Sequence, residues 1–164
     1  MTDYYSQEIQ KKARTSGKYN EVMANLTKCP LCDLKEKYIL LEMEEIVLTV
    51  NLFPYIDGHL MIIPRRHMEK ISELKAKEWT VVKKLLDIGM NIIKTEFDIE
   101  AVNILYREGQ KSGASLGHLH FHLIPTPEGF VTTINGQGIS WNYQKLDYTP
   151  LEMAERLRKH VKKN

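Results

Sequence analysis

The segment that most constrains the fold is a heptad in which imidazole and apolar side chains alternate: His118-Leu119-His120-Phe121-His122-Leu123-Ile124. Successive side chains of a β-strand point to opposite faces, so the alternation predicts a strand whose three histidines share one face. An imidazole near its free pKa can act as a nucleophile or as a general acid and base at neutral pH. From these residues alone, a metal-binding strand and a chance row of polar surface residues remain open alternatives.

Other periodic segments predict the rest of the architecture. The remaining strands are expected in four apolar runs, at residues 38–41, 46–50, 59–63 and 101–106. From Leu74 to Phe97 the apolar residues recur at helical spacing with lysines between them, which predicts one long amphipathic helix and places Trp79 in the core. The run Thr149-Pro150-Leu151-Glu152 has the N-cap, first-turn proline and acidic third position of a helix start.

Composition favours one globular domain spanning residues 1–164, because 43% of the residues are hydrophobic and 27% are charged. Clustered strands with a single long helix predict an α+β fold on a mainly antiparallel sheet. Residues 5–26 are expected to form a polar helix or extension that is broken near Ser16-Gly17, and residues 130–148 have no clear assignment.

Charge and hydropathy limit the classes of partner. The formal net charge is only +2, and apart from the C-terminal tail, where we expect His160 to be solvated, the basic residues are dispersed. Nothing therefore demands nucleic acid as a partner. No apolar stretch resembles a signal peptide or is long enough to span a bilayer, so we expect no membrane association and a cytoplasmic location.

The heptad matches the pattern His-φ-His-φ-His-φ-φ, with φ apolar, and in this it resembles the histidine triad (HIT) superfamily of nucleotide hydrolases and transferases. A second stretch, from Asn51 to Pro64, contains Gly-His followed by four apolar residues and a proline, as that family does. The resemblance covers residues 29–125, with 1–27 as an N-terminal extension and 126–164 as a C-terminal segment. It implies a HIT-like fold with five strands, an adenine nucleotide as substrate, and a homodimer to which the long helix would contribute.

The same resemblance implies roles for individual residues. The middle histidine, His120, would be the nucleophile that takes up a nucleoside monophosphoryl group, and His118 and His122 would complete the catalytic triad. Asn51 is implied as a ribose contact and Ser115 as a phosphate contact.

The loop before the heptad carries further candidates for phosphate binding. Backbone N–H groups at Gly113 and Ala114 could bind a phosphate, because glycine lets the chain approach it closely; alternatively residues 113–117 are only a flexible connector. Arg107 departs from the family pattern, which usually has Asn or Gln there, and a cation at this position could hold a longer polyphosphate or an incoming phosphate.

The reaction type stays open between related chemistries. His122 keeps the full triad, where several transferase and phosphorylase branches carry Gln, and this favours hydrolysis of dinucleoside polyphosphates or adenylated amines. Other phosphorylase-like members keep all three histidines, and residues 113–116 look similar to theirs. A Mg²⁺ ion could accompany a polyphosphate substrate. The alternative from a different class is a zinc-stabilised nucleotide-binding module without useful turnover.

The two cysteines, Cys29 and Cys32, have the spacing of a zinc half-site or of a redox pair. A redox pair belongs at a strand-to-helix junction in a βαβ pattern, which this region lacks, so zinc is favoured. In zinc-containing members of the family that the chain resembles, the other ligands correspond to His67 and His118, with His59 as an alternative to His67. Four protein ligands leave no position for water, which makes the expected zinc structural.

Overall fold

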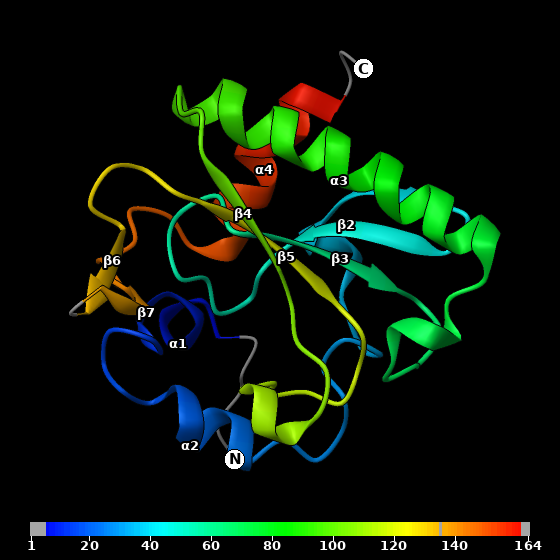
Figure 1. Ribbon diagram of the computed structural model, residues 1–164, viewed down its shortest axis with the longest axis horizontal. Coiled ribbons are helices and arrows are strands. Elements are labelled where there is room, and N and C mark those ends of the chain that lie inside the picture. The colour runs from blue at the N-terminus through cyan, green and yellow to red at the C-terminus, as the bar shows by residue number, and fades with distance from the viewer. Residues whose placement is uncertain (1–5, 135, 162–164) are drawn as a thin grey trace.

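A five-stranded antiparallel sheet forms the centre of the computed structural model, which describes residues 6–134 and 136–161 (Figure 1). Its strands follow the order β1-β2-β3-β5-β4, and every neighbouring pair is antiparallel. The strand bounds are β1 Ile39–Met43, β2 Ile46–Val50, β3 Leu60–Pro64, β4 Val102–Tyr106 and β5 Phe121–Pro125. The predicted α+β fold with a five-stranded, mainly antiparallel sheet is therefore confirmed.

The long helix α3 (Ala76–Phe97) covers one side of this sheet, while the short helices α1 (Gln7–Lys12) and α2 (Tyr19–Ala24) lie on the other side (Figure 1). Leu48 of β2 and Leu123 of β5 both point toward α3, where they surround Gly89. Because side chains alternate along a strand, the neighbouring His122 faces the opposite side of the sheet.

The C-terminal helix α4 (Pro150–Val161) begins where the sequence predicts. The Thr149 hydroxyl accepts the Glu152 backbone N–H at 3.2 Å, and the Glu152 carboxylate accepts the Thr149 N–H at 2.7 Å, which is a capping box. The expectation that His160 is solvated is wrong, because its ring contacts the Glu96 carboxylate of α3 and its side chain is only 16% exposed. Glu96 thereby ties the two long helices together.

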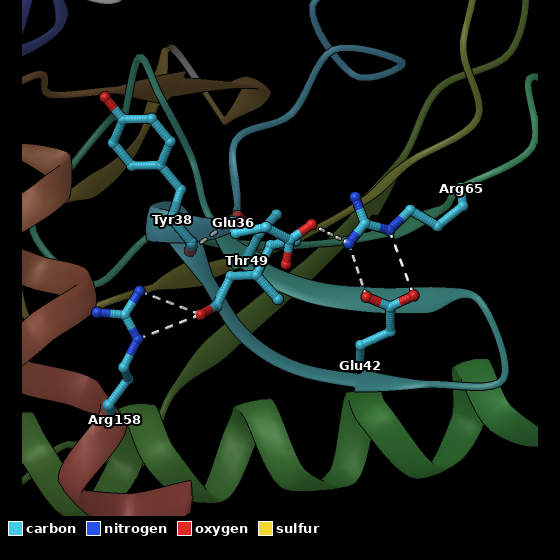
Figure 2. A network of polar contacts seen from close by, with 7 residues as sticks. Glu36, Tyr38, Glu42, Thr49, Arg65 and Arg158 are labelled. Carbon is cyan, nitrogen blue, oxygen red and sulfur yellow. Dashed lines mark hydrogen bonds and ion pairs between the residues drawn. The ribbon is translucent and has the colours of Figure 1, made fainter.

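Polar contacts fix the start of β1 against its neighbours. Figure 2 shows the Arg65 guanidinium between the carboxylates of Glu36 and Glu42, at 2.6 and 2.7 Å. From α4, Arg158 donates to the Ile39 carbonyl at 3.3 Å, and Thr49 of β2 donates to the Tyr38 carbonyl at 3.0 Å. The edge of the sheet is thus held by Arg65, just after β3, and by side chains from α4 and β2.

Three local features differ from the expectation. Strand β5 begins at Phe121, so His118 and His120 lie in the segment before it and not in the strand. A hairpin of β6 (Val131–Ile134) and β7 (Gln137–Trp141) occupies the region that had no assignment. Trp79 is 45% exposed rather than in the core, since it lies at the margin of the apolar stripe of α3, where its ring meets Phe121.

None of the helices formed by the described residues combines the length and the apolar character that are needed to cross a bilayer. The predicted cytoplasmic location, the homodimer and the single-domain organisation stay predictions.

We expect Gly89→Ala to destabilise the protein by about 1–3 kcal/mol, although alanine is the better helix former. A Cβ at this position would lie 2.5 Å from Leu123 and 3.2 Å from Leu48, both fully buried, so the core must shift to admit it. The matched control is Asn91→Ala on the exposed face of α3, which should change the free energy of unfolding by less than about 0.5 kcal/mol. Urea denaturation measures both; equal effects would contradict the close packing of α3 on the sheet.

Candidate active site and metal centre

A cleft of about 420 Å³ opens on the side of the sheet that faces away from α3. The predicted site residues that line it are Asn51, Arg107, Gly113, Ala114, Ser115, His120 and His122. The fold therefore brings Asn51 together with the others, which lie between residues 107 and 122, in one cavity. His118 does not line the cleft, and its side chain turns instead toward the cysteines.

A backbone contact orients His120, whose ring is 8% exposed at the cleft wall. Its Nδ1 lies 2.7 Å from the carbonyl oxygen of His118. A carbonyl can only accept, so Nδ1 carries the proton and Nε2 keeps its lone pair. This is the tautomer that a nitrogen nucleophile needs.

A chain of hydrogen bonds sets the opposite tautomer in His122. The Tyr55 backbone N–H donates to Nδ1 of His59 at 3.2 Å, which leaves the proton of a neutral His59 on Nε2. That Nε2 lies 2.8 Å from Nδ1 of His122 and donates to it. His122 then carries its own proton on Nε2, as a donor beside the His120 ring, whose centroid is 4.6 Å away. His59 is thus a buried, hydrogen-bonded residue of the core.

Burial keeps all three rings neutral near physiological pH. For His59 and His122, burial is the largest cause that holds the pKa well below the usual value, and positive charge on Arg14 and Arg107 adds to it. Burial also lowers the pKa of His120, against the effect of its bond to the His118 carbonyl. Neutral imidazoles can both attack a phosphorus atom and donate a single proton.

Asn51 reaches the cleft but its amide is engaged within the protein. The Phe53 backbone N–H donates to its Oδ1 at 2.8 Å, and its Nδ2 donates to Nδ1 of His59 at 3.4 Å. The side chain is only 6% exposed. This geometry shapes the loop after β2, and the ribose contact implied for Asn51 stays a prediction.

The loop between β4 and β5 places the other expected phosphate contacts. The Ser115 hydroxyl lies 2.6 Å from the hydroxyl of Tyr19, which comes from α2. Gly113 has a φ of +83°, a backbone conformation that residues with a side chain rarely adopt. Arg107 donates from Nη1 to the Tyr55 hydroxyl at 3.1 Å, which aims its charge along the cleft wall.

Sequence reasoning missed the residues that come from the two ends of the chain. Arg14, between α1 and α2, lines the cleft together with Tyr19, and Tyr143 approaches from the segment after β7. Tyr55, in the loop before β3, packs at the centre of this group. The polar N-terminal segment shows only weak periodicity, and no local motif marks these side chains, so only tertiary structure could find them.

A second cluster unites the four predicted metal ligands: Cys29, Cys32, His67 and His118. Their ligand atoms all lie within 4.8 Å of one another. Nδ1 of His118 is 3.4 Å from each sulfur, and Nδ1 of His67 is 3.2 Å from that of Cys32. The structure thus assembles His67, and not His59, with the cysteines.

Hydrogen bonds prepare this cluster for a cation. His118 donates from Nε2 to the Pro64 carbonyl at 2.9 Å, so the lone pair of Nδ1 points toward the sulfur atoms. Burial raises the pKa of the Cys29 thiol, but its contact with the His118 ring and hydrogen bonds from the backbone of Cys32 and Leu31 outweigh it and lower the pKa to about 6. For Cys32, burial and the neighbouring Cys29 raise the pKa to about 11. A thiolate is the form in which cysteine binds metals.

A model of the HIT domain matches residues 34–129, more than half of the chain. The chain belongs to the HIT domain family. An uncharacterised HIT-like protein of Mycoplasma genitalium is 27% identical over 128 residues, which are 76% of this chain and 86% of that protein.

Two named enzymes are also similar. The bis(5'-adenosyl)-triphosphatase of Saccharomyces cerevisiae is 33% identical over 60% of this chain and 46% of its own length. The AP-4-A phosphorylase of Mycobacterium tuberculosis is 27% identical over 69% of this chain and 60% of its own length. The chain therefore spans about half of the yeast enzyme and three-fifths of the mycobacterial one.

Solved structures share the fold. A hypothetical histidine triad nucleotide-binding protein from Sulfolobus tokodaii superimposes with a TM-score of 0.66 at 23% identity, over 82% of this chain and 93% of that one. A Zn-bound histidine triad family protein from Mycobacterium smegmatis gives a TM-score of 0.66 at 16% identity, over 83% and 94%.

We expect the free energy of unfolding to fall as the pH drops below about 6.5, the pKa of histidine in an unfolded chain. Burial lowers the pKa of His59 and His122 in the fold, so below that pH the unfolded chain binds protons that the native protein excludes. Each ring contributes up to about 1.4 kcal/mol per pH unit, and above that pH neither contributes.

Urea denaturation at about pH 7.5 and about pH 5.5 tests this linkage. The double variant His59→Gln with His122→Gln should lose less stability on acidification than the wild type, whatever its absolute stability. Lys84→Gln, an exposed change on α3, should keep the wild-type response. An unchanged acid response in the double variant would show that these two rings are not the source.

Proposed function

We propose that this chain cleaves nucleoside 5′-phosphoryl bonds, in dinucleoside polyphosphates or adenylated amines, through a covalent intermediate on His120. The observation that carries the proposal is the tether of His120 Nδ1 to the His118 carbonyl, which leaves the Nε2 lone pair as the nucleophile. The two similar enzymes, a bis(5'-adenosyl)-triphosphatase and an AP-4-A phosphorylase, support a dinucleotide substrate.

In the first step, Nε2 of His120 attacks the phosphorus of the nucleoside monophosphoryl group. A P–N bond forms, the P–O or P–N bond to the leaving group breaks, and the leaving group takes that electron pair. Nε2–H of His122 donates to the phosphoryl oxygen or to the departing atom. In the second step, water attacks the phosphorus and gives up a proton to the solvent. The P–N bond breaks, its electron pair returns to Nε2 of His120, and the nucleoside monophosphate leaves.

The lining of the cleft supports these roles. Ser115 and the backbone around Gly113 and Ala114 offer donors to the phosphoryl oxygens, where negative charge accumulates in the transition state. The apolar side chains of Leu31 and Leu52 offer a surface on which a nucleobase can lie. Asn51 lines the cleft beside Leu52 and is the candidate ribose contact.

A phosphorylase is the second candidate, and Arg107 favours it. A guanidinium binds orthophosphate through charge-assisted hydrogen bonds, and Arg107 lines the same cleft as His120. Orthophosphate would then attack the intermediate in place of water and release a nucleoside diphosphate. The related AP-4-A phosphorylase supports this alternative.

Product analysis of diadenosine tetraphosphate, with Mg²⁺ and orthophosphate present, separates the candidates. A hydrolase gives AMP plus ATP, and a phosphorylase gives ADP plus ATP. We expect His120→Asn to reduce either turnover by about 10³-fold or more, because the nucleophile is lost. His160→Asn is the matched control, since this histidine lies on α4 outside the cleft. Binding of nucleotide without turnover in the wild type would favour the non-catalytic binding module.

We further propose that Cys29, Cys32, His67 and His118 hold a structural zinc ion. Zn–S bonds of about 2.3 Å and Zn–N bonds of about 2.0 Å in a tetrahedron separate sulfur from nitrogen by about 3.5 Å. The three sulfur–nitrogen distances of 3.2 to 3.4 Å fit that geometry. The ion would fix the segment that carries the His118 carbonyl, and so the orientation of His120. The Zn-bound histidine triad family protein from Mycobacterium smegmatis, which shares this fold, supports this assignment.

Metal analysis of the purified protein should find about one zinc per chain in the wild type. We expect Cys32→Ser and His67→Ala to lose the metal and to lower the melting temperature, because a structural zinc stabilises the fold directly. Lys28→Gln, which removes an exposed ion pair to Asp33 beside Cys29, should keep both. Full zinc in His67→Ala would exclude His67 as a ligand.

A further inference from the structure

Arg14 and helix α2 lie outside the segment that matches the HIT domain, yet they build one wall of the cleft. Arg14 donates from Nε to the Phe53 carbonyl at 3.1 Å, and the Tyr19 ring packs edge-on against Phe53 at 5.7 Å. The Tyr19 hydroxyl reaches Ser115 across the cavity. Three contacts therefore hold this segment against the candidate active site.

Two guanidinium groups flank a single aromatic ring in this wall. The Arg14 guanidinium stands 4.4 Å from the centroid of the Tyr55 ring and 3.5 Å from that of Tyr19. Arg107 donates to the Tyr55 hydroxyl. The same ring lies 6.0 Å from that of His122, so both cations stand beside the proposed catalytic histidines.

Among the described residues, Arg14 and Arg107 have no acidic partner, and the same is true of Arg158, which donates from α4 to backbone carbonyls and does not line the cleft. Arg65, Arg66 and Arg156 each form an ion pair with a glutamate. Within residues 6–134 and 136–161, neither Arg14 nor Arg107 forms such a pair, and no carboxylate lines the cleft. The positive charges of Arg14 and Arg107 both contribute to the lowered pKa of His122. An uncompensated positive field in a cleft concentrates anions.

The two substrate classes of the proposed function differ on the leaving side of the scissile bond. A dinucleoside polyphosphate releases a phosphate chain with several negative charges, whereas an adenylated amine releases a neutral or cationic amine. One cation suffices for the phosphoryl group that both classes share. A second unpaired cation attracts the phosphate chain and repels a cationic amine, so it discriminates between them.

We propose that Arg14, acting with Arg107, binds the phosphates beyond the scissile bond and selects polyphosphate substrates over adenylated amines. This inference rests on the proposed function and deepens it. Arg14 is a specificity-determining residue here, supplied by the N-terminal segment and held in place by the Phe53 carbonyl and the Tyr19 ring. The bond breaks at His120 whether or not Arg14 is present.

Arg14→Gln in the full chain tests the assignment by two readouts. We expect kcat/KM for diadenosine tetraphosphate to fall about 10- to 100-fold, while that for adenosine 5′-phosphoramidate falls less than about 3-fold. The dissociation constant of ATP should rise about 10-fold or more and that of AMP less than about 3-fold, because AMP has no phosphate beyond the first. Arg14→Lys keeps the positive charge but not the two parallel N–H donors of the guanidinium, so it should weaken ATP binding by an intermediate factor.

Lys12→Gln is the matched control, because it removes a cation from α1 whose partner is the exposed Glu8. It should leave all four quantities near the wild-type values. Equal losses for ATP and AMP in Arg14→Gln, or no loss for ATP, would overturn the assignment and leave Arg14 with a purely structural role at Phe53. Failure of the proposed function would look different: the wild type would not turn over diadenosine tetraphosphate, and the two binding constants would still report on Arg14.

Discussion

The pairing of β3 with β5 is the contact on which both candidate sites depend. Its register sets Met61 opposite His122, which brings the first half of the chain beside the histidine heptad. Just before β3, His59 meets His122, and at the end of β3 the Pro64 carbonyl accepts a hydrogen bond from His118. A slip of one residue would turn every side chain of β5 to the other face and separate both pairs.

Backbone carbonyls and N–H groups, more than charged side chains, fix the tautomers of three histidines, and His59 then sets that of His122. The His118 carbonyl, the Pro64 carbonyl and the Tyr55 N–H each bind one ring nitrogen and so decide which other nitrogen is free. This arrangement suits a buried site, because a neutral imidazole does not carry the desolvation cost of an ion. No carboxylate of the described residues lines the cleft, so the negative charge beside the arginines would come from the bound ligand.

The sequence predicted the structure best where a single spacing of apolar residues dominated a segment. The helix from 74 to 97, the strand runs and the capping box at Thr149 follow from spacing that packing reinforces. The site roles expected for Asn51, His120 and His122, which line one cavity, came from the family resemblance and not from spacing. The limits of β5 did not follow, because the alternation of the sequence continues through His118 and His120, which precede the ladder. Arg14 and Tyr143 escaped notice because their roles depend on loops that meet only in three dimensions.

Asp57 joins the last part of the chain to the loop before β3, since its carboxylate accepts the N–H groups of Asp147 and Tyr148 at 2.8 and 3.3 Å. Close by, Lys11 of α1 donates to the Asp147 carbonyl at 2.8 Å. The segments that precede and follow the matched domain therefore fasten to each other as well as to the sheet. In such an arrangement the central sheet can keep the histidines and their chemistry unchanged during evolution. Paired changes in the two outer segments can meanwhile alter which molecules reach those histidines.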